Sequence, residues 1–239
     1  MLVVRIDREA KRNAIDVETA QGIDAALNRL DDDPELWVGV LTGTPAVFSA
    51  GSDIRDGLYA RTERGGEYGL IRRKRIKPLV AAVEGPAFGG GFEIALACDL
   101  VVASATARFA LPETRRGLIA SSGALLRLSR VLPAPLAAEI LIAGGELDAN
   151  RAYTFGLVNR VTEPGGALQG AVELAEQVCR NSPVAVRATL AALAEQREQA
   201  ESVGWAATQR ALTAISGSAD AVEGVAAFFE KREPIWPAH

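Results

Sequence analysis

The stretch GPAFGGGFEIALACDL, residues 85–100, decides the fold of this 239-residue chain. It follows the apolar run Leu79–Val83, a buried strand candidate, and its three consecutive glycines, Gly89–Gly91, precede a helix expected from about Phe92. Glycine lets the backbone approach a bound group closely, and the first amides of a helix are free donors. Such donors stabilise negative charge that develops on a carbonyl oxygen. The alternative is a flexible turn packed tightly against a neighbouring segment.

Two glutamates in and near this stretch are candidate proton-transfer groups. Glu93 lies between Phe92 and Ile94, and an apolar setting raises the pKa of a carboxyl group, although a helix N-terminus favours the anion. Glu113 follows an apolar approach that ends in a proline. The more common alternative for each is a solvent-exposed carboxylate, and Glu113 also has nearby arginines as partners. The sequence alone does not bring the two together.

The composition argues against several classes of protein. The net charge is 26 − 30 = −4, without the basic excess of a general nucleic-acid binder. The longest uncharged stretch, residues 36–52, is interrupted by polar residues and falls short of the roughly 18 apolar residues of a membrane span. Residues 1–5 lack the cationic head and apolar segment of a signal peptide. Cys98 and Cys179 are consistent with reduced thiols, so we expect a cytoplasmic protein.

The single histidine, His239, is the last residue, and this narrows the possible chemistry. Ser-His-Asp and Cys-His catalysis need an imidazole fixed beside the nucleophile, and zinc sites need more ligands than two lone cysteines supply. No Gly-x-x-x-x-Gly-Lys-Ser/Thr loop is present either. An enzyme with this sequence would work with carboxylates, backbone amides, hydroxyls and guanidinium groups.

Hydrophobic periodicity predicts alternating strands and helices before Ala134 and mostly helices after it, which indicates a single α/β domain with a helical C-terminal part. The expected strands are Leu2–Asp7, Trp37–Leu41, Leu79–Val83 and Leu100–Ala103. The expected helices are one capped by Asp16, one from Pro135 to Gly144, one over Leu168–Cys179, and a last one capped by Asp220 with Glu223.

Three further segments of the sequence are expected to have a structural role rather than a functional one. The segment Tyr59–Lys77 is charged and contains glycines, which is typical of a mobile surface insertion. Its basic run Arg72–Arg75 is more often a solvated helix face than a phosphate site. Phe228–Phe229 is expected to pack in the core beneath the last helix rather than to hold a ligand.

Taken together, these segments resemble the enoyl-CoA hydratase/isomerase (crotonase) superfamily over essentially the whole chain. The first matching segment, Arg8–Ile15, departs from the family pattern at Glu9, where proline is usual. The matching segments are REAKRNAI (Arg8–Ile15), FSAGSDI (Phe48–Ile54), GPAFGGGFEIALACDL (Gly85–Leu100), ARFALPETRRGL (Ala107–Leu118), AYTFGLVNRV (Ala152–Val161) and AAFFEKREPIW (Ala226–Trp236). Their order and spacing make the resemblance specific, because any one of them alone would be weak.

The resemblance implies a crotonase-like spiral of ββα units, with a core over residues 1–180 and a helical trimerisation region over residues 181–239. It implies an acyl-CoA thioester as substrate, in which coenzyme A is part of the substrate and no metal or other cofactor is needed. It also implies a homo-oligomer, a trimer or a dimer of trimers. Neither nucleic acid nor a membrane is an expected partner.

The resemblance also assigns roles to residues of this sequence. Glu93 would activate the water that adds at Cβ, and Glu113 would deliver the proton at Cα. The backbone amides of Ser52 and Gly90 would form an oxyanion hole for the thioester oxygen. Lys231 would reach a CoA phosphate, although a solvated lysine is the simpler interpretation. The residues expected to bind substrate are Lys11, Arg12, Ala14, Ala50, Ser52, Asp53, Ile54, Arg55, Gly89 and Ser121.

One departure and several alternatives remain. Ser121 stands where many hydratases have a glycine beside the water, and the motifs are closest to carnitinyl-CoA dehydratase-like members, so a polar or branched acyl group is an option. Retention of both glutamates favours hydration of a 2-enoyl-CoA, or the reverse dehydration. The alternatives are a Δ3,Δ2-enoyl-CoA isomerase, a catalytically weak acyl-CoA-binding member, and acyl-CoA hydrolysis or decarboxylation.

Overall fold

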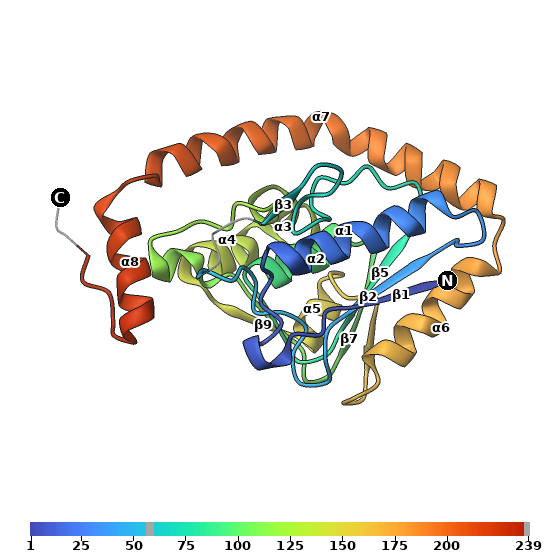
Figure 1. Cartoon of the computed structure of the whole chain (residues 1–239), viewed down its shortest axis with the longest axis horizontal. Helices are drawn as coiled ribbons and strands as arrows, with labels where there is room; N and C mark the ends of the chain where they lie inside the picture. The colour runs from blue at the N-terminus through green and yellow to red at the C-terminus, as the bar shows by residue number, and fades with distance from the viewer. Residues whose placement is uncertain (56–59, 237–239) are drawn as a thin grey trace.

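A five-stranded parallel sheet forms the centre of the computed structural model, which describes residues 1–55 and 60–236 (Figure 1). The strands, in spatial order, are β1 (Leu2–Arg5), β2 (Gly39–Thr42), β5 (Leu79–Val83), β7 (Leu100–Ser104) and β10 (Arg160–Thr162). All neighbouring strands in this sheet pair in parallel, so the predicted α/β class is confirmed. Tyr59 and His239, which the sequence singled out, lie outside the described residues.

The sheet is buried on both faces, which explains why β5 reads LVAAV without a polar residue. Val80 and Ala82 pack with Ala171 and Ala175 of α6 on one face. Leu79 and the other alternate residues of β5 belong to the larger core on the opposite face. The helices are α1 (Val17–Asp32), α2 (Gly90–Ala97), α3 (Ala124–Val131), α4 (Ala134–Ala143), α5 (Ala149–Thr154), α6 (Ala167–Cys179), α7 (Pro183–Ile215) and α8 (Ala219–Glu230), with the 3₁₀ turns η1 (Glu9–Lys11) and η2 (Pro112–Arg116).

A second, three-stranded sheet positions the candidate site. Its strands are β6 (Pro86–Phe88), β8 (Arg108–Ala110) and β9 (Glu146–Asp148), in that order. β6 runs parallel to β8, so the start of α2 after β6 lies beside η2 after β8. The Gly89 amide donates to the Ala110 carbonyl at 2.9 Å and fixes this register. Glu93 on α2 and Glu113 in η2 are thereby brought to the same end of the sheet.

Most of the predicted elements are confirmed, with ends shifted by a few residues. Asp16 caps α1, since its Oδ1 accepts from the Thr19 amide at 2.8 Å. Pro135 lies in the first turn of α4, which ends at Gly144 in the left-handed region, with φ of 66°. The predicted cap of the last helix is wrong: Ser218 Oγ accepts from the Ala221 amide at 3.1 Å, and Asp220 lies within the first turn.

The prediction of a surface insertion before Lys77 is wrong. The segment contains β3 (Arg61–Thr62) and β4 (Gly66–Glu67), and residues 65–71 are buried. The Arg73 side chain is fully buried, with Nη2 donating to Asp24 at 2.6 Å and Nη1 to Asp31 at 3.0 Å. The run Arg72–Arg75 is therefore not a solvated helix face as a whole, because internal ion pairs hold Arg73 while Lys74 stays exposed at the surface.

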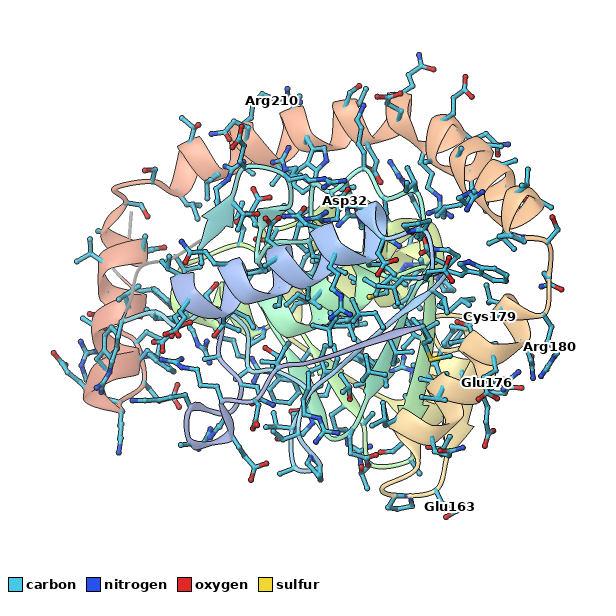
Figure 2. The ribbon with its side chains drawn as sticks, turned by 45° about the vertical axis from the view of Figure 1, so that its right-hand side comes forward. Asp32, Glu163, Glu176, Cys179, Arg180 and Arg210 are labelled. Atoms are coloured by element: carbon cyan, nitrogen blue, oxygen red, sulfur yellow. The ribbon has the colours of Figure 1, made fainter. Side chains whose placement is uncertain are left out.

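The C-terminal helices extend away from the core. α7 arches over the body and leads to α8 at one end of the molecule (Figure 1). Arg210 points outward from α7 (Figure 2). Of the residues of α7, only Thr208 is buried. Phe228 and Phe229 on α8 are 43% and 42% exposed, so the prediction that they pack in the core is wrong for the single chain. Among the described helices, none combines the length and apolar character needed to cross a membrane.

Replacement of Arg73 by methionine is expected to destabilise the protein. The change leaves the buried Asp31 carboxylate with only the more distant Arg64 guanidinium, 3.8 Å away, and breaking a buried ion pair costs about 3–5 kcal/mol. The measurement is the free energy of unfolding in urea. Lys74→Met is the control: Lys74 pairs at the surface with Glu198, so its loss should cost less than about 1 kcal/mol. Equal losses from the two variants would contradict a buried anchor in this segment.

Candidate active site

The three glycines at the start of α2 are each required by close packing. A Cβ on Gly89 would lie 3.0 Å from Glu113 Oε1, and one on Gly90 would lie 2.5 Å from the Tyr68 hydroxyl. A Cβ on Gly91 would lie 2.3 Å from the Ser49 carbonyl oxygen. At Gly90 and Gly91 these distances are too short for a real side chain, and at Gly89 the contact is tight and the φ of 54° also favours glycine. The predicted alternative of a tightly packed turn is therefore realised, and two of its close neighbours, Tyr68 and Glu113, carry polar groups.

The Ser49–Ile54 loop meets this turn from the other side. It is held by the N-terminal segment, since the Ile15 amide donates to the Gly51 carbonyl at 2.8 Å and the Asp53 amide to the Ile15 carbonyl at 2.9 Å. A Cβ on Gly51 would lie 2.7 Å from the Gly90 amide nitrogen, so the loop and the start of α2 touch. Neither the Ser52 amide nor the Gly90 amide donates a hydrogen bond to a described residue. Two unpaired amides from separate turns thus lie next to one another.

Glu93 is buried at the start of α2, with 2% of its surface exposed. This excludes the solvent-exposed alternative. Its Oε1 accepts from the Ala124 amide at 3.1 Å, at the N-terminus of α3. Burial first, and then the charge of Glu113, raise the pKa of Glu93 to about 8, against the hydrogen bond that favours the anion. Glu93 is therefore placed to exchange a proton near neutral pH.

Glu113 lies in η2 with its carboxyl group turned towards Gly89. The residue is half-buried, but its Oε2 is inaccessible to water and has no hydrogen-bond partner among the described residues. Burial raises the pKa of Glu113 to about 7, although the charge of Arg116 favours the anion. Neither Arg115 nor Arg116 forms an ion pair with it, so the predicted alternative of an arginine partner is not realised. An unpaired buried carboxyl oxygen is costly and indicates a place for a ligand.

Tyr68 is a site residue that sequence reasoning missed. It is 2% exposed, and its hydroxyl lies 2.8 Å from Ser52 Oγ and against Gly90. Burial and the charges of Glu93 and Glu113 raise its pKa, so the phenol stays protonated. The only signal in the sequence was GEYGL, residues 66–70, in which a glycine lies on each side of the tyrosine. The charged residues of the surrounding segment led to the prediction that it lies at the surface.

Ser122, one position after the predicted Ser121, is a second missed residue. Its Oγ is fully buried and makes no hydrogen bond to a described residue, yet it lies close enough to the Tyr68 hydroxyl to favour its ionisation. Ser121 itself is 9% exposed, in the turn before α3. Ser122 is therefore the serine that lies beside the Tyr68 hydroxyl.

The other predicted substrate-binding residues surround this centre at varying distance. Lys11 and Arg12 are exposed at η1, where the Arg12 carbonyl accepts from the Ala50 amide at 3.0 Å. Asp53 bonds Arg8 Nη1 at 2.6 Å, and this bond holds the pKa of Asp53 below its usual range. Asp53 thus helps to fix the loop.

The remaining predicted residues lie along the loop and on α8. Ala14, Ala50 and Ile54 are half-buried along the loop. The exposed Arg55 lies 5.8 Å from the Phe229 ring, and Lys231 is exposed at the end of α8. These positions form a surface around the loop and α8, outside the centre that holds Glu93 and Glu113.

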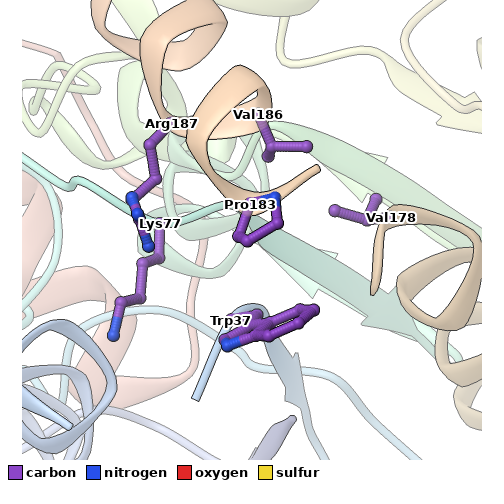
Figure 3. Close-up of a pocket in the computed structure, with 6 residues that line it drawn as sticks. All are labelled: Trp37, Lys77, Val178, Pro183, Val186 and Arg187. Carbon is purple, nitrogen blue, oxygen red and sulfur yellow. The ribbon is translucent and has the colours of Figure 1, made fainter. Parts of the chain in front are cut away.

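A small pocket elsewhere in the chain is not this site. It is lined by residues before β2, at the end of α6 and at the start of α7, and has room for about one water molecule, about 10 Å³ (Figure 3). The Lys77 ammonium there donates to the Leu30 and Asp33 carbonyls at 2.8 and 2.6 Å, so its charge is already used. The lining residues are Trp37, Lys77, Val178, Pro183, Val186 and Arg187.

Comparisons with known proteins show which family and which fold this chain resembles. The family model described as enoyl-CoA hydratase/isomerase matches residues 1–239. Mevalonyl-coenzyme A hydratase of Aspergillus fumigatus is 40% identical over 245 residues, 99% of this chain and 91% of that protein. Carnitinyl-CoA dehydratase of Salmonella arizonae is 37% identical over 250 residues, 100% of this chain and 95% of that protein. A crystal structure of carnitinyl-CoA hydratase from Mycobacterium avium superimposes with a TM-score of 0.91 at 37% identity and covers 100% of this chain and 95% of that one. The predicted crotonase-like fold is confirmed.

Replacement of Glu93 by glutamine is expected to stabilise the protein increasingly as the pH rises. A folded-state pKa raised to about 8 means that ionisation opposes folding, so wild-type stability falls between the ordinary glutamate pKa of about 4.3 and pH 8. Glutamine keeps an acceptor for the Ala124 amide and has no charge to bury. The gain in unfolding free energy should grow by at least about 1.4 kcal/mol, the equivalent of one pKa unit, between pH 5 and pH 8.

Glu223→Gln is the matched control for this measurement. Glu223 is paired with Arg232, which lowers its pKa to about 2, so its charge is the same in both states throughout that range. Its effect on stability should not change between pH 5 and pH 8. A constant effect of Glu93→Gln over the same range would contradict the raised pKa.

Proposed function

The chain belongs to the enoyl-CoA hydratase/isomerase family, and from this premise we propose that it adds water to a 2-enoyl-CoA or removes water from a 3-hydroxyacyl-CoA. The observation that carries the proposal is the placement of two buried, protonatable glutamates beside two unpaired backbone amides. Hydration needs a base for water, an acid for Cα, and donors for the thioester oxygen. One cluster supplies all three kinds of group.

In the proposed reaction, the Ser52 and Gly90 amides bind the thioester oxygen as it gains negative charge. Addition at Cβ pushes electrons through the conjugated system onto that oxygen, so donors that are already in place lower the barrier without reorganisation. Backbone amides do not titrate in the working range of pH. The close contact between Gly51 and Gly90 supports a common binding point for both donors.

The two carboxyl groups divide the proton transfers. Ionised Glu93 takes a proton from water as its oxygen bonds to Cβ, and protonated Glu113 gives a proton to Cα. Dehydration runs the same steps in reverse, from protonated Glu93 and ionised Glu113. Burial raises the pKa of both groups towards neutrality, so each of them can gain or lose a proton in the working range of pH. The roles themselves come from the family resemblance, since coupled groups share their titration.

The remaining parts of the proposal concern cofactors, assembly and location. Addition of water transfers protons without net oxidation, so the proposal includes no metal or redox cofactor.

We propose a homo-oligomer, in which the exposed apolar residues Val184, Leu193 and Val203 of α7 would be covered by other subunits. Light scattering should then give three or six times the mass of the 25.2 kDa chain, and a monomer would contradict it. The cytoplasmic location stays a prediction.

Glu93→Gln and Glu113→Gln are each expected to lower kcat for crotonyl-CoA hydration at least about 100-fold, the usual contribution of a positioned acid or base. Each variant removes one proton-transfer group and keeps the shape of the site. Glu139→Gln on the exposed surface of α4 is the control and should retain wild-type turnover. Wild-type turnover in either site variant would overturn the two-carboxylate mechanism.

Isotope incorporation separates hydration from double-bond isomerisation. In ¹⁸O-labelled water, the 3-hydroxyacyl-CoA product should carry one labelled oxygen, whereas an isomerase would shift the double bond of a 3-enoyl-CoA without incorporating any. Tight binding of acyl-CoA thioesters with no turnover across a broad panel would instead indicate a binding protein.

A further inference from the structure

Tyr68 reaches the site from a strained backbone. Its φ of 56° lies in the left-handed region, which is rare for a bulky residue and persists only where surrounding contacts enforce it. Such outliers concentrate at functional sites. Here the strained residue places its hydroxyl 2.8 Å from Ser52 Oγ, at the loop whose amide is proposed to bind the thioester.

The segment around Tyr68 is built to hold this conformation. The Tyr68 amide donates to the Ala60 carbonyl at 2.8 Å, and the Arg72 amide donates to the Gly65 carbonyl at 2.8 Å. The buried Arg73 fastens the end of the segment to α1. The tyrosine is therefore a fixed wall of the site, rather than a side chain that swings away when substrate enters.

This wall is polar beside the start of α2 and the two glutamates. The Tyr68 hydroxyl lies against Gly90, within electrostatic reach of both Glu93 and Glu113. Beside it, Ser122 Oγ is fully buried and has no partner among the described residues. Ser52 Oγ holds the Tyr68 hydroxyl at 2.8 Å, and Ser122 Oγ lies near the same hydroxyl without a well-formed hydrogen bond, so both hydroxyls retain hydrogen-bonding capacity for a ligand.

We propose that Tyr68 and Ser122 make this site selective for acyl chains that carry a hydrogen-bonding group, such as a hydroxyl, on the carbon next to Cβ. The inference rests on the proposed function, because it places Cβ between the two glutamates. A hydroxyl on Cγ would bond the two side-chain hydroxyls and complete their hydrogen bonding. An alkyl chain would leave the remaining hydrogen-bonding capacity of the two hydroxyls unsatisfied, and a site built to bond a hydroxyl discriminates strongly against an analogue that lacks it.

The test compares two substrates that differ by one oxygen atom, crotonyl-CoA and 4-hydroxycrotonyl-CoA. Wild type is expected to favour the hydroxylated thioester at least tenfold in kcat/KM. In Tyr68→Phe and in Ser122→Ala this ratio should fall below threefold, mainly through a higher KM for the hydroxylated substrate. Tyr153→Phe, on the exposed surface of α5, is the matched control and should keep the wild-type ratio.

Two outcomes overturn the inference. One is a wild-type ratio near one; the other is an equal loss with both substrates in Tyr68→Phe and Ser122→Ala, which would mean that the hydroxyls only support the fold. Thermal denaturation of each variant checks that it is folded.

Binding measurements separate failure of this inference from failure of the proposed function. Butyryl-CoA and 4-hydroxybutyryl-CoA are saturated and cannot be hydrated, so calorimetry with them measures recognition even if the wild type hydrates neither substrate. Tenfold tighter binding of the hydroxylated analogue, lost in Tyr68→Phe, supports the inference without any turnover. Equal binding of the two analogues contradicts it, even if crotonyl-CoA is hydrated.

Discussion

Burial of two neighbouring carboxyl groups is the constraint on which this structure depends. Glu93 is enclosed by apolar residues of α2 and α3, and Glu113 faces the same turn from η2, so burial and mutual charge disfavour the doubly ionised state. The pair therefore keeps a proton near neutral pH. Proton exchange with a bound substrate then needs no histidine, and the described residues of the site include none.

The glycines make this arrangement sterically possible. The start of α2 has to pass within contact distance of Ser49, Tyr68 and Glu113 at successive residues, and a single Cβ at any of these positions would push one partner away. Gly51 performs the same function in the facing loop. The two sheets hold these turns at fixed positions, because β5 continues through β6 into α2 and β8 leads directly to η2. The chemistry is thus positioned by backbone contacts more than by side-chain interactions.

Sequence reasoning predicted the parts that depend on local pattern and missed those that depend on long-range pairing. The apolar run of β5, the Asp16 cap and the glycine triplet each carry a local signal, and so does Glu93 among apolar neighbours. The prediction for the segment before Lys77 was wrong because its arginines were expected to be solvated. Arg73 instead pairs with Asp24 and Asp31, more than 40 residues away in sequence. Tyr68 was missed because it lies in that segment. Phe228 and Phe229 were predicted to pack in the core, although they are exposed on α8.

A direct titration of the two glutamates tests the central claim most sharply. With glutamate labelled by ¹³C at Cδ, NMR spectra of wild type, Glu93→Gln and Glu113→Gln identify the two resonances and follow them with pH. The account predicts apparent pKa values near 7 and 8 for the pair, and a lower pKa for Glu93 in Glu113→Gln, because the neighbouring charge is gone. Titration of both groups near the ordinary value of about 4.3, unaffected by the partner, would contradict it.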